Sequence, residues 1–167
     1  MRLGASAALT TERLLLEPLS PLHAEEMAPV LADPDLHTYV GGMPLALDEL
    51  REQYVRQSRG RSLDGTQSWC NWIVRKRSSL EAVGYVQATV DNASRSADVA
   101  WVVGSQYQGQ GYATEAATAM VTWLRDTGVV TVTAHVHPAH LASSAVAAAT
   151  GLRRTSAVID GEIRWER

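Results

Sequence analysis

The chain has 167 residues, the size of one globular domain, and its 46% hydrophobic and 20% charged residues argue against a disordered or fibrous protein. The formal net charge is -3 and the basic residues are scattered, so we expect no nucleic-acid or anionic membrane partner. The single cysteine, Cys70, excludes an intrachain disulfide and a multi-cysteine zinc site. No apolar run approaches the ~18 residues of a membrane span, and no signal-peptide pattern opens the chain. We therefore expect a cytoplasmic protein.

Hydrophobic periodicity and turn residues predict the elements in chain order. Residues 1–10 show no periodicity and are expected to be a flexible tail, and residues 11–167 are expected to form a single domain. Strands are predicted over residues 11–17, 69–75, 82–90, 96–103, 129–136, 153–159 and 162–166. Helices are predicted over residues 22–31, 47–59, 112–127 and 141–150. The three strands between residues 69 and 103 favour an antiparallel meander.

The helix over residues 112–127 has the most regular apolar stripe, and it follows a loop that contains Gly109 and Gly111. It begins without an Asp, Ser or Thr at its cap, so the amides of its first turn have no side-chain acceptor. Free amides and the positive end of the helix dipole attract anions, and glycine lets a phosphate approach the backbone. The pattern predicts a phosphorylated ligand. A glycine turn that only joins strand to helix explains the same two residues equally well.

Two common phosphate-binding motifs do not fit this loop. A P-loop needs a lysine directly after its last glycine, and Lys76 is the only lysine of the chain. A dinucleotide-binding fingerprint needs a third glycine where Thr114 stands, within an early strand-helix-strand unit. Both motifs are therefore excluded.

The residues Gln106 to Gly111 fit the Q/R-x-x-G-x-G/A motif of the GCN5-related N-acetyltransferase (GNAT) family, and Gln108 to Ala116 resembles its pyrophosphate loop and the helix that follows. Downstream, Ala134 to Pro138 with Ser143 is similar to a segment of the branch that contains ribosomal-protein alanine N-acetyltransferases. The residues near both ends of the chain resemble the same branch. The resemblance therefore spans residues 11–166.

The resemblance implies an α/β (α+β) fold. Its central sheet is mixed and mostly antiparallel, with about seven strands flanked by four helices, and is splayed between the fourth and fifth strands. The implied activity is transfer of the acetyl group of acetyl-CoA, as co-substrate, to a primary amine of a protein N-terminus or small molecule by direct attack in a ternary complex. No metal is implied, and a homodimer stays open because dimers are common in the family. The alternative is a non-catalytic acyl-CoA-binding or sensing domain of the same fold. The sequence does not identify the amine.

The resemblance also implies a cofactor-binding set, in which backbone amides hold the CoA pyrophosphate, Gln106 braces the loop and strand residues contact the pantetheine arm. The set is Val102, Val103, Gln106, Gln108, Gly109, Gln110, Gly111, Tyr112, Ala113, His140 and Ser143. At one position the chain departs from the family, because His140 stands where an asparagine is expected. This departure makes the usual polar contact to the CoA arm uncertain.

Two residues are candidates for the proton transfers of amine acetylation. Asp98 aligns with an acidic residue common in this branch and is the candidate base; a water chain, or a purely structural carboxylate paired with Arg95, are the alternatives. Ser143 is the candidate proton donor, because the helix over residues 141–150 lacks the tyrosine that many relatives use. Its alternative is a simple hydroxyl at a helix N-terminus.

Three histidines and a short loop complete the candidates. His135 and His137 share one face of a predicted strand, and with His140 they form an H-x-H-x-x-H string. No acidic or cysteine partner is near in sequence, so we expect no metal, although one histidine near the thioester is a further candidate base or donor. The loop with Tyr39, Gly41 and Gly42 and the helix over residues 47–59 occupy the region that shapes the acceptor pocket in this fold, with ordinary packing as the alternative.

Overall fold

The structure is a computed structural model that describes residues 3–167. Its strands are β1 (Leu9–Thr10), β2 (Leu14–Pro18), β3 (Gln67–Lys76), β4 (Ala82–Asp91), β5 (Ser96–Val103), β6 (Thr131–Val136), β7 (Arg153–Ile159) and β8 (Glu162–Glu166). Its α-helices are α1 (Ala24–Val30), α2 (Leu47–Gln57), α3 (Tyr112–Asp126) and α4 (Leu141–Ala149), with the 3-10 turns η1 (Pro21–His23), η2 (Pro34–His37) and η3 (Ser105–Tyr107). No helix within residues 3–167 is long and apolar enough to cross a membrane.

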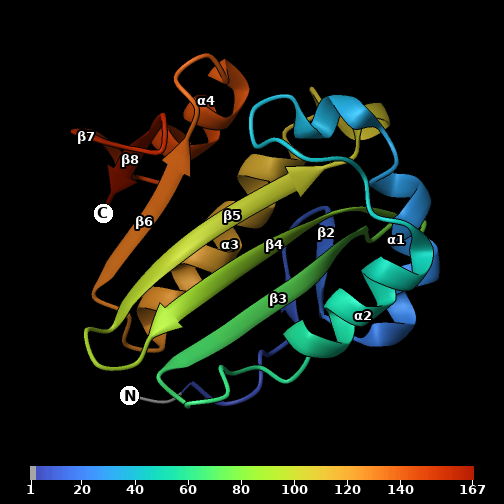
Figure 1. The fold of residues 1–167 in the computed structure, drawn as a ribbon, viewed down its shortest axis with the longest axis horizontal. Helices are drawn as coiled ribbons and strands as arrows, with labels where there is room; N and C mark the ends of the chain where they lie inside the picture. The colour runs from blue at the N-terminus through green and yellow to red at the C-terminus, as the bar shows by residue number, and fades with distance from the viewer. Residues whose placement is uncertain (1–2) are drawn as a thin grey trace.

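The strands of this part of the chain form one 8-stranded sheet in the order β1-β2-β3-β4-β5-β6-β8-β7 (Figure 1). Neighbouring strands are antiparallel except β5 and β6, which are parallel. The predicted mixed, mostly antiparallel sheet with four α-helices is therefore confirmed.

The N-terminal end differs from the sequence prediction, because the segment predicted as a flexible tail contains β1, a strand that was not predicted. Leu9 and Thr10 pair with Leu16 and Leu15 of β2, and Leu9 packs against the core. Nearby, the indole Nε1 of Trp72 donates a hydrogen bond to the carbonyl oxygen of Ala7 at 2.8 Å. A strand of two residues is too short to show an alternation of apolar and polar residues in the sequence. Only its pairing with β2 in the folded chain identifies it.

The predicted first helix is divided into η1 and α1. Ser20 caps η1, since its hydroxyl accepts from the Leu22 amide while its own amide donates to Nδ1 of His23 at 2.9 Å. Pro29 lies inside α1, which ends one residue later at Val30. α1 therefore ends one residue before the predicted boundary at residue 31, with the proline in its last turn.

β5 and β6 separate along their length. They pair only where Ser96, Ala97 and Asp98 lie beside Thr131, Val132 and Thr133, and Figure 1 shows the two strands diverging from there toward α4. This confirms the splay predicted between the strands over residues 96–103 and 129–136. The edge of β5 that faces β6 is consequently unpaired from Val99 onward.

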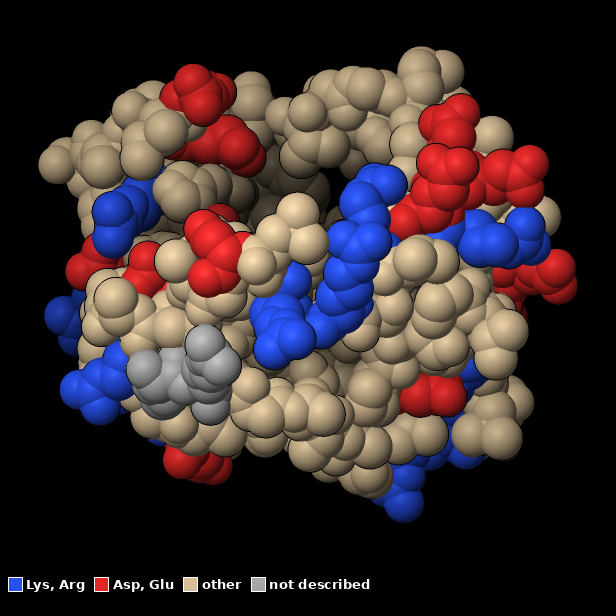
Figure 2. Space-filling model, turned by 60° about the horizontal axis from the view of Figure 1, so that its bottom comes forward, with Lys and Arg blue, Asp and Glu red and all other residues tan. Residues whose placement is uncertain are grey.

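Helices cover both faces of the sheet. In Figure 1, α3 lies behind the sheet and α2 in front of it. Trp123 of α3 packs edge-on against Trp72 of β3 with ring centroids 5.3 Å apart, and Met120 and Leu124 are fully buried on the same side. Outside this core, Figure 2 shows basic and acidic residues scattered over a surface made mostly of other residues.

Arg75 of β3 joins α1 to the edge of the sheet. Its Nε donates to Glu17 of β2 at 2.6 Å, and its terminal nitrogens donate to both oxygens of Glu26 on α1. The Arg75 side chain is only 13% exposed. Hydrogen bonds from Arg75 lower the pKa of Glu17 and of Glu26, and the two carboxylates raise the pKa of Arg75.

We predict that Arg75→Leu lowers the free energy of unfolding at pH 7 by about 1–3 kcal/mol, because two half-exposed carboxylates lose their shared partner. A carboxylate whose pKa is depressed in the folded state stabilises above its unfolded pKa, and this contribution is lost as pH falls through the folded value. The difference between the variant and the natural chain should therefore shrink at about pH 3.5. Urea unfolding at both pH values measures this difference in the free energy of unfolding.

The exposed Arg153→Leu serves as the control, with little effect at either pH. A deficit of Arg75→Leu that is equally large at both pH values would show that the side chain stabilises by packing alone.

Candidate active site

The N-terminus of α3 is open, as the sequence predicts. Gly111 is the N-cap residue, with a φ of 83° in the left-handed region, and no side chain caps the helix. Gly109, two residues earlier, has a φ of 76°, and a Cβ there would meet nothing within 4 Å. The free amides of the first turn and the positive end of the α3 dipole therefore face space that an anion can enter.

The loop before α3 is held by Tyr107 and Gln108. Tyr107 is buried and its hydroxyl donates to the Glu81 carboxylate, while Nε2 of Gln108 donates to the carbonyl oxygen of Val103 at 3.0 Å. The side chain of Gln106, which the resemblance assigns to bracing the loop, is exposed beside Tyr107. Gln106 thus interacts with Tyr107, which holds the loop, and its own bracing role stays a prediction.

A second anchor holds the start of α3 to the turn between β1 and β2. Glu115, in the first turn of α3, accepts hydrogen bonds from the Thr11 hydroxyl, from the Arg13 amide at 3.0 Å and from Arg13 Nε at 2.8 Å. Burial raises the pKa of Glu115, but these hydrogen bonds outweigh it and hold the pKa below its usual range. The Arg13 guanidinium also donates to the carbonyl oxygen of Gln110 at 2.9 Å and lies 4.7 Å from the Tyr112 ring centre. A positive charge therefore lies beside the loop that contains Gly109 and Gly111, which we call the glycine loop.

The glycine loop lines a cleft of about 280 Å³ that also touches β5, α4 and the η2 segment. Eight members of the predicted cofactor set line it: Val102, Val103, Gln108, Gly109, Gly111, Ala113, His140 and Ser143. Gln106, Gln110 and Tyr112 are outside this lining. The structure thus brings residues from β5, the start of α3 and the start of α4 to one cavity, next to the splay.

His140 takes the capping position of α4. Its Nδ1 accepts from the Ser143 amide at 3.3 Å, and its Nε2 lies 3.2 Å from the Ser143 hydroxyl oxygen. Burial and the neighbouring His137 lower the pKa of His140, so the ring is neutral near pH 7. Since Nδ1 accepts, the proton of the neutral ring is on Nε2 and is donated to Ser143. The Ser143 hydroxyl proton is then free to point into the cleft.

Tyr39 connects the η2 segment to the other side of this cleft. Its ring centre lies 4.6 Å from that of His140 and 5.1 Å from that of His137. Tyr39 therefore contributes to the cleft that holds the glycine loop, whereas the sequence assigned it to the acceptor region.

Asp98 lies at the last paired position before the splay, opposite Thr133. Its Oδ1 accepts from the Thr133 hydroxyl at 3.2 Å and is 3.0 Å from Nδ1 of His135. The side chain beside Asp98 is thus His135 rather than Arg95. Asp98 lines neither cavity and lies four residues before Val102, or about 13 Å along the strand.

The three histidines of the H-x-H-x-x-H string have different hydrogen-bond partners. His135 contacts Asp98, the His137 ring accepts from the Ala139 amide, and His140 caps α4. Within residues 3–167 there is no group of three or more His, Cys, Asp or Glu side chains arranged to hold a metal ion.

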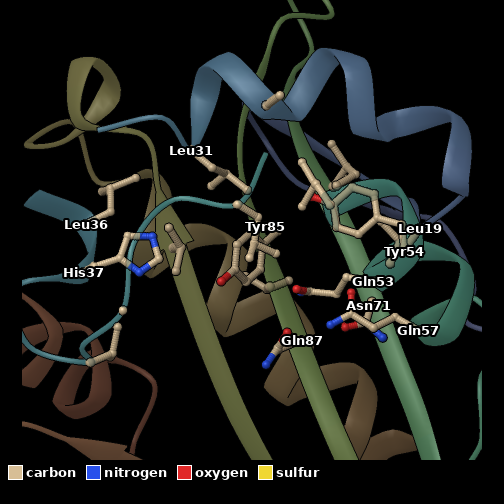
Figure 3. Close-up of a pocket in the computed structure, with 18 of the residues that line it drawn as sticks. Leu19, Leu31, Leu36, His37, Gln53, Tyr54, Gln57, Asn71, Tyr85 and Gln87 are labelled. Atoms are coloured by element: carbon tan, nitrogen blue, oxygen red, sulfur yellow. The ribbon is translucent and has the colours of Figure 1, made fainter. Parts of the chain in front are cut away.

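A second cavity of about 310 Å³ lies between α2, the loop over residues 36–45 and the sheet (Figure 3). We call it the acceptor-side pocket. Gly41 and Gly42 line it, as the sequence led us to expect. It shares Leu36 and Val102 with the cleft of the glycine loop, so the two cavities meet at these residues.

Sequence analysis missed His37, which lines the acceptor-side pocket. Its Nδ1 is 3.2 Å from the carbonyl oxygen of Gly41. A carbonyl oxygen only accepts, so Nδ1 carries the proton and Nε2 of the neutral ring keeps a free lone pair. The pair of glycines after Tyr39 could have indicated such a tight loop, but no local pattern distinguishes His37 from the other histidines.

Comparisons with known proteins agree with this geometry. Residues 13–153 match the family model described as an acetyltransferase (GNAT) domain. A GNAT-family acetyltransferase structure from Bacillus anthracis has a TM-score of 0.77 at 18% identity, covering 96% of this chain and 96% of that one. RimL, a ribosomal L7/L12 alpha-N-protein acetyltransferase solved with coenzyme A, has a TM-score of 0.77 at 13% identity, with 96% and 97% covered.

The microcin C7 self-immunity acetyltransferase MccE, solved with acetyl-CoA and AMP, has a TM-score of 0.77 at 13% identity, with 94% and 93% covered. At these identities the likeness establishes the fold. No protein in the curated set matches the chain significantly.

We predict that Gly111→Val lowers the free energy of unfolding by about 1–2 kcal/mol, because residue 111 has a left-handed φ and a side chain with a Cβ is strained there. The new Cβ would also lie 3.3 Å from a guanidinium nitrogen of Arg13. Urea unfolding measures the loss. Gly4→Val is the control, since Gly4 has open space around it and no positive φ. Equal stability of Gly111→Val and the natural chain would contradict the strain argument.

Proposed function

The chain belongs to the GNAT acetyltransferase family, and from this premise we propose that it transfers the acetyl group of acetyl-CoA to a primary amine of a small molecule or protein N-terminus. The observation that supports the proposal most is the open N-terminus of α3 at the edge of a cleft that lies next to the splayed strands. The cleft offers an anion site at one end and an unpaired strand edge beside it. A phosphorylated carrier with a long polar arm fits both.

In this proposal the backbone amides of Gln108–Ala113 hold the CoA pyrophosphate, with Gln106 beside them. The left-handed glycines keep side chains away from the phosphate oxygens, and the Arg13 guanidinium adds positive charge at Gln110. Val102 and Val103 present the unpaired edge of β5 to the amide groups of the pantetheine arm. His140 and Ser143 approach the arm from α4.

Acetyl transfer forms a bond between the amine nitrogen and the acetyl carbon while the carbon–sulfur bond breaks. The amine loses a proton and the departing thiolate gains one. We assign the donation to Ser143, because Nε2–H of His140 binds its oxygen and leaves the hydroxyl proton free. Ser143 regains a proton from solvent after transfer.

We assign proton acceptance to His37, because its Nε2 lone pair is free and the residue lines the pocket that meets the cleft at Leu36 and Val102. Asp98, the candidate from the sequence, is hydrogen-bonded to Thr133 and His135 outside both cavities. Its role as the base stays a prediction, and loss of the proton through a water chain is the alternative.

We predict that acetyl-CoA at about 100 times its Kd adds roughly 2.7 kcal/mol of stability, or about 5–10 °C in Tm for a domain of this size. NAD and ATP at the same concentration are controls for general nucleotide binding. The measurement is a thermal melt followed by an assay for CoA release with an amine present. No shift with acetyl-CoA would overturn the proposal, and a shift without turnover on any amine would favour the non-catalytic sensing domain.

A pH profile separates the two candidate bases. We predict that His37→Asn lowers kcat at pH 7 about 100-fold or more and abolishes the acidic limb of kcat/KM that is left once the titration of the substrate amine is divided out, since no imidazole remains to accept the proton. Asparagine can still donate to the Gly41 carbonyl, so the loop contact is preserved. Asp98→Asn is the matched comparison and should keep the acidic limb. A profile in which Asp98→Asn loses the limb and His37→Asn keeps it would assign the base to Asp98.

A further inference from the structure

The acceptor-side pocket has no charged lining. Among the described residues that line it there is no Asp, Glu, Lys or Arg. The charged residues of α2, such as Glu52 and Arg56, lie on the exposed side of the helix and outside the lining. A ligand in this pocket therefore meets no side chain that can neutralise a permanent charge, apart from His37 when it is protonated.

The lining divides into an apolar wall and a polar end. α2 contributes Leu50, Gln53, Tyr54 and Gln57, which recur at helical spacing on one face. On the sheet, Asn71 of β3 and Gln87 of β4 are directly opposite each other. Figure 3 shows the side-chain amides of Gln53, Gln57, Asn71 and Gln87 toward one end of the pocket, with Leu31 and Leu36 on the far side and Leu19 beside Tyr54.

These amides are available for a ligand. Within residues 3–167, none of the side chains of Gln53, Gln57, Asn71 and Gln87 makes a hydrogen bond to another residue. Each primary amide offers two donors and a carbonyl acceptor, and none carries charge. The set therefore suits a neutral amide, carbonyl or hydroxyl group.

Tyr54 adds a stronger indication that a polar ligand belongs here. Its side chain comes from α2 into the pocket, the residue is only 4% exposed, and its hydroxyl has no hydrogen-bond partner. Buried hydroxyl groups are nearly always paired, and an unpaired one costs about 1–3 kcal/mol. Burial raises the pKa of Tyr54 and of Tyr85, so both phenols stay neutral near pH 7.

We propose that the acceptor is a primary amine whose amine is its only charged group, with an apolar body and a neutral amide or hydroxyl. This inference rests on the proposed acetyl transfer. The amine lies where the pocket meets the cleft, at Leu36 and Val102, the body lies along the leucines, and the neutral polar group reaches Tyr54 and the amides of the opposite end.

The geometry disfavours acceptors with a second charge. The second ammonium of a polyamine or an aminoglycoside, or the carboxylate of a free amino acid, would enter a pocket with no fixed counter-charge. An unpaired charge in such surroundings is strongly unfavourable. The class of acceptor is therefore selected by what the lining lacks as well as by the amides that it offers.

The test is a comparison of kcat/KM for four probes with acetyl-CoA: tyramine, leucinamide, leucine and spermidine. In leucinamide an amide replaces the carboxylate of leucine, which also makes the amine less basic, so kcat/KM is compared per unprotonated amine for all four probes. We expect leucinamide to exceed leucine, and tyramine to exceed spermidine, each by at least about tenfold, which is 1.4 kcal/mol. Preference for leucine or spermidine, or no transfer to either monoamine, would overturn the inference.

A variant pair checks that the pocket is responsible. Gln53→Glu places a carboxylate inside the lining, and Arg56→Gln changes the net charge of the chain by the same amount outside it, on the same helix. We expect Gln53→Glu to raise the ratio of spermidine to tyramine kcat/KM at least about tenfold and Arg56→Gln to leave it unchanged. An equal shift in both variants would trace selectivity to overall charge and contradict the assignment to this pocket.

Acetyl-CoA binding, measured by thermal melt, separates a failure of the proposed function from a failure of the proposed acceptor class. Loss of binding would overturn the proposed function itself, whereas binding together with preferred transfer to charged acceptors would overturn the acceptor class alone. A leucine-initiated hexapeptide amide, compared with leucinamide, distinguishes a chain N-terminus from a free small molecule as the source of the same chemistry.

Discussion

The separation of β5 from β6 is the constraint on which the rest of the site depends. Two parallel strands that pair over only three positions leave an unpaired edge on β5 and a gap that α4 and the start of α3 border. Unpaired strand edges usually invite further strands. Here a cleft lies at that edge, so backbone groups that a closed sheet would consume remain available to an extended ligand. β5 ends at Val103 and α3 begins at Tyr112, so the glycine loop connects the unpaired strand to the open helix end.

The anion site needs its helix to be fixed in place, and residues distant in sequence do this. Glu115 binds Thr11 and Arg13, which precede it by about a hundred residues, and the same arginine contacts the carbonyl of Gln110. A carboxylate in the first turn complements the helix dipole, and its cationic partner lies beside the loop that faces the cleft. The pair thus anchors the turn between β1 and β2 to α3 without closing the N-terminus of the helix. A conventional N-cap side chain would have occupied the amides instead.

The sequence predicted the parts of this site that local chemistry determines. Gly109 and Gly111 before an uncapped, strongly periodic helix are a local pattern, and the splay followed from the family resemblance that this loop carries. His37 could not be found in this way, since its role depends on a carbonyl four residues away and on helices that close the pocket around it. The same holds for β1, for the Glu115 contacts and for the amides of the pocket, which come from α2, β3 and β4. For Asp98 the strand was predicted correctly but the partner was not, because pairing with His135 depends on the register of β5 and β6.

An uncharged pocket next to an anion site also bears on how the amine becomes reactive. In water an alkyl primary amine has a pKa near 10.4 and an α-amino group one of about 8, so at neutral pH most of either is ammonium and cannot attack a carbonyl. Moving it into surroundings that offer no counter-charge disfavours the charged form and lowers that pKa. The acceptor-side pocket contains no carboxylate to oppose this effect, and the fixed positive charge of Arg13 lies at the other cavity. In the proposed reaction, desolvation therefore does part of the deprotonation, and the base accepts a proton from an ammonium that is already more acidic than it is in water. The same absence of charge that restricts the acceptor thus helps to generate its nucleophile.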